Sequence, residues 1–191
     1  MSTVKTTNLQ HPSASDVGIT LGADGSVVLP QGFTGGLGTN VVQTVKTDTF
    51  STSSGTFTAI TGLTVTITPS SATSKILLIA SIAMSDSSSA SNGVQVRFTG
   101  GNAANYIGDA ASSRTQAASA VNTGAGSDMV PNSFTQSLVY LDSPATGSAV
   151  TYAVEMRTSA GPAHINRSRS DTDSNAFARV PSGITAIEVA V

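Results

Sequence analysis

The stretch that decides the fold is TGLTVTITPSSATSKILLIASIAM, which spans residues 61–84. Three apolar residues in its first part alternate with threonines, namely Leu63, Val65 and Ile67. Strict alternation predicts a strand with one buried and one wet face, and Pro69 can end it because proline lacks the backbone donor. Residues 75–84 are apolar on both faces, which predicts a central strand covered on two sides. A buried helix is the alternative for this second run, although serine clusters flank it and helix caps are absent.

Similar strand patterns recur on both sides of this stretch. Apolar runs separated by turn residues return about every 8 to 12 residues, a spacing typical of sandwiches and jelly rolls. The expected strands are residues 41–49, 56–60, 63–68, 75–84, 94–98, 134–142, 149–158 and 184–191, with shorter candidates at 106–107 and 176–180. Long loops are expected in the rest of 101–132. Loops of this length inside a compact domain are usually functional or covered by a partner. We therefore predict an all-β fold, a jelly-roll-like β-sandwich.

Two of these strands carry further expectations. The run 134–142 ends in a turn-rich segment, and we expect 149–158 to return as its hairpin partner. The last run has Ile187, Val189 and Val191 on one face, so we expect this terminal strand to lie in the core.

Residues 1–40 differ from the rest and are predicted to form an extended N-terminal arm, with the head at 41–191. Asp24-Gly25 lies between alternating apolar positions, and this dipeptide favours a type I′ turn, so a small hairpin is expected at 17–29. An isolated hairpin is barely stable in water, so it needs a partner surface. The glycine-rich residues 32–38 are predicted to be a flexible joint. A disordered tail is the alternative for this region.

The composition excludes several classes of protein. Only 10% of the 191 residues are charged, against about 25% in a typical domain. Cysteine is absent, which rules out disulfides and thiolate metal sites. The net charge is −2 with nine basic residues, so no nucleic-acid partner is expected. No apolar run of about 18 residues occurs, so no membrane insertion is expected. The start lacks the apolar core of a secretory signal, which predicts synthesis in the cytoplasm.

Few residues are candidates for catalysis. His11 lies beside a proline in the arm, and His164 is predicted to lie in a loop. Glu155 and Glu188 stand in apolar strands, where each is expected to face water or pair with a neighbour, Arg157 sharing the face of Glu155. We therefore expect no enzyme, and assign no catalytic or cofactor-binding residue and no cofactor.

One string resembles the opening of a calcium-binding loop. Residues 171–175 match the pattern D-x-D-x-N, but Ala176 stands where an EF-hand needs glycine and Ser182 where it needs glutamate. An Asx-rich turn is the favoured interpretation, with a looser calcium site as the alternative. No metal ligand is assigned.

Two segments resemble known phage proteins. Residues 5–30, KTTNLQHPSASDVGITLGADGSVVLP, resemble the N-terminal segment of tail-fibre and other virion proteins of marine and cyanobacterial phages. In that group a K-x-x-N-[IL]-Q-H-P-S-A string precedes an apolar hairpin. Residues 41–82 are similar to β heads of phage fibre proteins, in which T-G-L-x-V-x-I-T-P-x-x-x-x-S-K-I-L recurs, carried here by residues 61–77. Residues 100–132 have no such counterpart.

The resemblance implies an arm that docks on other virion proteins and a trimeric head. The residues expected to anchor the arm are Lys5, Asn8, Leu9, Gln10, His11, Pro12, Ile19, Leu21, Val27 and Leu29. The expected function is that of a structural component of a tailed-phage virion, a short tail-fibre or appendage protein whose head contacts a host-surface glycan or protein. A capsid decoration protein, of the cement or head-fibre type, is the alternative with the same organisation. A polysaccharide depolymerase is disfavoured because the chain is short and unrepeated.

Overall fold

The computed structural model describes residues 8–9, 19–21, 27–28, 40–86, 93–122 and 133–190. The chain divides into two compact units, Met1–Gly36 and Leu37–Ala190. In the first unit, β1 (Asn8–Leu9), β2 (Ile19–Leu21) and β3 (Val27–Val28) form a three-stranded antiparallel sheet with β2 in the middle. The pair β2–β3 is the hairpin expected at 17–29, and β1 adds a strand that the sequence pattern did not indicate.

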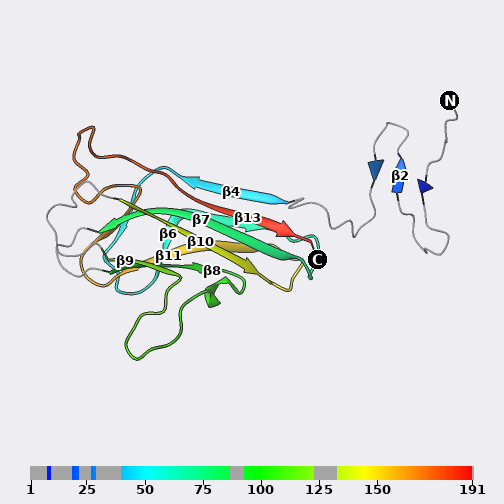
Figure 1. The fold of residues 1–191 in the computed structure, drawn as a ribbon, viewed down its shortest axis with the longest axis horizontal. Coiled ribbons are helices and arrows are strands. Elements are labelled where there is room, and N and C mark those ends of the chain that lie inside the picture. Colours follow the sequence, from blue (N-terminus) through cyan, green and yellow to red (C-terminus); the bar gives the residue numbers. More distant parts are fainter. Residues whose placement is uncertain are drawn as a thin grey trace. The chain divides into compact units, whose positions relative to one another are not determined.

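The second unit is a sandwich of two antiparallel sheets (Figure 1). One sheet, called the β7 sheet below, contains β4 (Val41–Lys46), β5 (Phe50–Thr52), β7 (Lys75–Asp86), β10 (Phe134–Asp142), β12 (Ala163–Ile165) and β13 (Ser182–Val189). The other, called the β11 sheet, contains β6 (Thr58–Ile67), β11 (Val150–Thr158), β8 (Gly93–Thr99) and β9 (Ser119–Asn122), in that order. A short 3-10 helix, η1 (Ala103–Asn105), follows β8. These sheets confirm the predicted all-β sandwich.

Two rows of the β7 sheet are built from broken strands. β12 and β13 lie on the same edge of β7, β12 opposite residues 84–86 and β13 opposite residues 75–81. On their far side, β5 pairs with β12 and β4 pairs with β13. Since β10 pairs with the other edge of β7, the sheet has four rows in the order β10, β7, β12 with β13, and β5 with β4.

The pairing is nested along the chain. The first row, β4 with β5, pairs with the last, β13 with β12; β6 pairs with β11; β7 pairs with β10; and β8 pairs with β9. Each strand therefore pairs with the strand at the mirrored position in the order. Such nesting is what a long antiparallel hairpin produces when it is wrapped into two facing sheets.

The core lies between the two sheets and is filled by alternate residues of their strands. The inward residues of β6 are buried while Thr64, Thr66 and Thr68 are exposed, which confirms the predicted alternation. The largest fully buried side chains are Tyr152, Phe98, Ile60, Leu63, Ile67, Ile76, Leu78, Ile82, Met84, Leu138, Met156 and Ile165. Burial of this apolar surface is the main force that holds the sheets together.

The runs 56–60 and 63–68 form a single strand, β6, rather than two. Gly62 lies within it at φ +80°, and the register against β11 shifts between Ala153 and Glu155. This is a bulge, in which glycine adopts the positive φ without the clash that a Cβ would cause. The turn-like sequence between the two runs therefore marks a kink inside a strand.

The predicted hairpin between 134–142 and 149–158 is wrong, because the two strands lie in different sheets. β10 pairs with β7, and β11 pairs with β6 and β8. The last strand lies in the core as expected, but its buried face carries Ile184 and Ala186. Ile187 and Val189 lie on the other side, and Val191 lies outside the described residues. Both faces of this run carry apolar residues, so the strands that cover it in the sandwich determine which face is buried.

Three shorter assignments also differ from the structure. Residues 106–107 follow η1 and form no strand, and the strand of this region is β9. Residues 176–180 form no strand either. His164 is buried in β12 rather than in a loop, where it pairs with Ser51 of β5 and Ser85 of β7. A three-residue strand held by two distant neighbours has too short a pattern to be recognised from the sequence.

Candidate functional site

The side of the β7 sheet that points away from the β11 sheet is the principal candidate for an interaction surface, and we call it the outer face. Residues of β7 alternate between the two sides: Ile76, Leu78 and Ala80 are buried, whereas Leu77 is half-buried and Ile79 is exposed. The prediction that this strand is covered on two sides is therefore wrong for residues 75–81, whereas residues 82–84 are buried on both sides as predicted. Both edges of β7 are paired, but over residues 75–81 only its inner side is covered.

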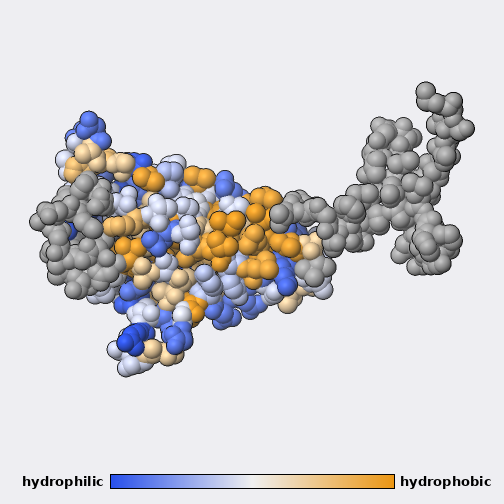
Figure 2. Space-filling view, viewed as in Figure 1, coloured by the Kyte–Doolittle hydropathy of each residue, from blue (hydrophilic) through white to orange (hydrophobic). Residues whose placement is uncertain are grey.

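Large apolar side chains gather on the outer face. Among the described residues, six large hydrophobic side chains are exposed, and five of them point outward from this one sheet: Val41 (55%), Val45 (55%), Ile79 (39%), Val139 (52%) and Leu141 (45%). Figure 2 shows hydrophobic residues gathered over the part of the sandwich where β7, β13 and β10 run side by side in Figure 1. Singly exposed apolar residues are ordinary, but a contiguous group marks a surface that binds something.

Strand register arranges these side chains in rows across the sheet. The first row crosses all four strands and is entirely apolar: Leu141 of β10, Leu77 of β7, Ile187 of β13 and Val41 of β4. The second row begins with two apolar residues and ends with two polar ones: Val139, Ile79, Thr185 and Gln43. In that row the side-chain amide of Gln43 donates to the hydroxyl of Thr185 at 2.9 Å. The third row contains Ser137, Ser81, Gly183 and Val45.

The outer face carries no charge in these three rows. Charged residues are depleted at the centres of protein interfaces, since each would have to shed water without a partner. Lys75 lies beyond the first row, at the end of β7. The face is therefore a surface that an apolar partner can cover without burying an ion.

The opposite surface of the sandwich, on the outward side of the β11 sheet, is polar. The hydroxyls of Thr66 and Thr151 lie 2.8 Å apart, and Arg97 pairs with Glu155 at 2.8 Å. The guanidinium of Arg97 also lies 4.1 Å from the centre of the Phe57 ring. Glu155 thus pairs with a neighbour as expected, but across the strands to Arg97 rather than along its own strand. The two outward surfaces differ, and only the one on the β7 sheet is apolar.

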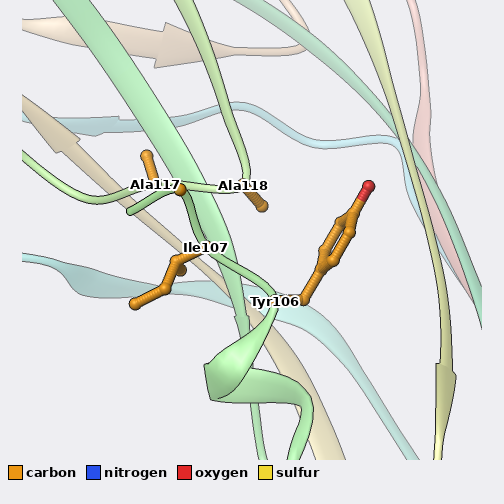
Figure 3. A pocket seen from close by; sticks show the side chains of 5 residues that line it. Tyr106, Ile107, Ala117 and Ala118 are labelled. Atoms are coloured by element: carbon orange, nitrogen blue, oxygen red, sulfur yellow. The ribbon is translucent and has the colours of Figure 1, made fainter. Parts of the chain in front are cut away.

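A small pocket of about 250 Å³ lies in the segment that follows β8. It is lined by Tyr106, Ile107, Gly108, Ala117 and Ala118, whose side chains are drawn in Figure 3. The Tyr106 ring stacks on Tyr140 of β10 at 5.1 Å between centres. The lining contains neither a charged group nor a side-chain amide, so it has little with which to orient a polar ligand.

Two buried carboxylates accept hydrogen bonds from residues that lie beside them in the fold. Glu188 accepts from the backbone N–H of Ser70 at 2.6 Å and from its hydroxyl. Burial raises the pKa of Glu188, but the hydrogen bonds from Ser70 and Ser74 outweigh it and hold that pKa below its usual value. Asp142 accepts from the hydroxyl of Tyr152 at 2.6 Å, and burial together with this bond raises the pKa of Tyr152 far above its usual value. Both carboxylates hold loops against strand ends.

The loop at 171–175 forms ion pairs with two arginines that flank it in the sequence. The Asp171 carboxylate pairs with Arg179 at 2.7 Å and with Arg167 at 3.6 Å. In the described part of the chain, no group of three acidic or histidine side chains is placed to hold a metal ion. Both guanidinium groups contact the same oxygen, Oδ2 of Asp171, and so compete with a cation for it.

The residues expected to anchor the arm fall into two groups. Leu9 lies opposite Ile19, and Leu21 opposite Val27, in the small sheet of the first unit, which also contains Asn8. Five others lie outside the described residues: Lys5, Gln10, His11, Pro12 and Leu29. Their anchoring role stays a prediction.

The sequence pattern did not reveal the outer face, because the same pattern is compatible with two different structures. A run that is apolar at odd and even positions, as in residues 75–80, is expected when both sides are covered. It is equally expected when one side is left for a partner. A second indication lies in β10, where Leu138 and Tyr140 already form an inward apolar side. The alternating Val139 and Leu141 are therefore a second apolar side, which points outward.

Comparison with known proteins adds no assignment. No protein-family profile matches the chain, and no curated protein shows significant similarity to it. Among the described residues, no helix has the length and apolar character needed to cross a membrane.

Proposed function

We propose that this protein is a structural component of a tailed-phage virion, a short tail-fibre or appendage protein. Its N-terminal arm docks on other virion proteins, and its β head forms a trimer that contacts the host surface. The support from the sequence is the resemblance of residues 5–30 and 61–77 to such proteins. The structural observation that favours it most is the division of the chain into a small N-terminal unit and a separate β-sandwich.

We further propose that the head is a jelly roll. The nested pairing supports this, because the eight rows form two four-stranded antiparallel sheets in the orders β10-β7-β13-β4 and β6-β11-β8-β9. A jelly roll is a double sheet of eight strands that contains two Greek keys. A stiff sandwich of this kind suits a module that is assembled once and then exposed on a particle.

Labelling of virions tests the proposed role. Antibodies raised against residues 41–191 would be bound to purified particles of the phage that encodes the chain and located by electron microscopy. Label at the tail is the expected result. Label on the capsid alone would contradict the tail assignment and favour a decoration protein, and particles without label would overturn the virion role altogether.

A further inference from the structure

We propose that the outer face of the β7 sheet is the surface through which copies of this chain associate. This inference rests on the proposed function for the expected copy number, three, but the surface itself is identified from the sandwich alone. The apolar row of Leu141, Leu77, Ile187 and Val41 is its centre. The occupant is a second copy of the chain.

Charge favours a second copy over another partner. The three rows of the outer face are uncharged, so identical faces can approach one another without like-charge repulsion. A charged partner would find no ion on this face with which to pair. A glycan would find few polar groups, because Gln43 and Thr185 already bond each other at 2.9 Å.

The size of the face agrees with an interface between subunits. Four strands about 4.8 Å apart, over the five residues from Ser137 to Leu141, give the three rows a flat area of roughly 300 Å². That area fits the apolar centre of an interface to which each partner contributes roughly 800 Å² in all, the remainder being a polar rim.

The edges of the sheet give a second reason for association. Within the described residues, β10 pairs only with β7, and β4 pairs only with β13. Exposed edges and an exposed apolar side together invite uncontrolled aggregation unless a defined partner covers them. A closed, symmetric assembly satisfies this requirement because it leaves no free apolar face.

Sedimentation of the full-length chain at micromolar concentration provides the test. The double variant Val139→Lys, Leu141→Lys places two ammonium groups at exposed positions, so the fold should tolerate it. In the assembly the same groups would be buried without partners, and self-association should weaken by about 100-fold or more. The matched control is Thr64→Lys, at an exposed position on the polar side of the β11 sheet.

The expected result is a trimer for the unaltered chain and for the Thr64 variant, and a monomer with unchanged circular dichroism for the double variant. A monomeric unaltered chain would overturn the inference. A double variant that remains a trimer would overturn it as well, because association would then use another surface.

Cross-linking keeps the test decisive if the double variant fails to fold. The chain contains no cysteine, so single cysteines at Val41, Ile79, Val139 or Leu141 would be the only thiols. A short bismaleimide should join subunits through at least one of these positions and not through Thr64→Cys. Failure at all four would refute the surface. A monomer found on virions would refute this inference alone, whereas a trimer absent from virions would refute only the proposed function.

Discussion

The hydroxyl of Ser182 donates a 2.6 Å hydrogen bond to the side-chain oxygen of Asn166, across the loop of residues 167–181. The amide nitrogen of Asn166 donates in turn to the backbone oxygens of Lys46 and Asp48, at 2.7 and 2.9 Å. Both Asn166 and Ser182 are buried. This pair therefore closes the loop at its base and lets β12 and β13 act as one row of the sheet.

Replacing Asn166 should destabilise the sandwich. Asn166→Gly keeps the positive φ of 62° accessible but removes the amide that donates to the backbone oxygens of Lys46 and Asp48 and accepts from Ser182. The free energy of unfolding should fall by about 2 to 3 kcal/mol. Urea unfolding followed by circular dichroism measures it. The exposed Asn175→Gly in the same loop is the control and should cost no more than about 1 kcal/mol; equal losses in both variants would contradict the role of the pair.

Gly62 should resist substitution because of its backbone and not because of crowding. A Cβ at this position would meet only the Lys46 ammonium nitrogen, at 3.8 Å, so space is available. Its φ of +80° nevertheless penalises alanine by about 1 to 2 kcal/mol. Gly55→Ala, where a Cβ would meet nothing within 4 Å, is the matched control. Thermal unfolding of the two variants should show a lower midpoint for Gly62→Ala only.

Glu188 should make the stability of the sandwich depend on pH. Its pKa in the folded chain lies below the value of an unfolded glutamate, about 4.3. Its contribution is therefore complete above that value and is lost as the pH falls through the folded pKa. Glu188→Gln should be less stable than the unaltered chain at pH 7, and the difference should shrink toward pH 3. A difference that stays constant over this range would contradict the assignment, and the exposed Asp173→Asn should match the unaltered chain throughout.

A chain without residues 2–38 should keep a folded sandwich. Asn40 is the first residue with described contacts to it: its backbone oxygen accepts from the N–H of Glu188 at 2.9 Å, and its side chain donates to Thr68 at 2.9 Å. The truncated chain should show the same β signal in circular dichroism, and under the proposed function it should no longer enter virions. Removing residues 2–46 instead deletes β4 and should unfold or aggregate the sandwich. Loss of the β signal in the shorter deletion would refute the boundary.

Strand positions were the most predictable part of the fold. The alternation over residues 63–67 lies in a strand with the expected inward residues, and the apolar run after Lys75 and residues 94–98 lie in strands as expected. These signals are local, because a strand shows its two faces in every pair of residues. The candidate site was less predictable, since nothing local tells an apolar side that faces the core from one that awaits a partner.

The amino-acid sequence by itself determined the class of the fold, most of its strands, the inward residues of β6, and the small number of charged residues. Only the tertiary structure decided that β10 pairs with β7 rather than with β11, that Asn166 and Ser182 join two half-strands, and which side of residues 75–81 is covered. The physical reason is that strand pairing and burial are set by neighbours far apart in the chain. The same apolar alternation fits either sheet until the nested pairing assigns each strand a partner.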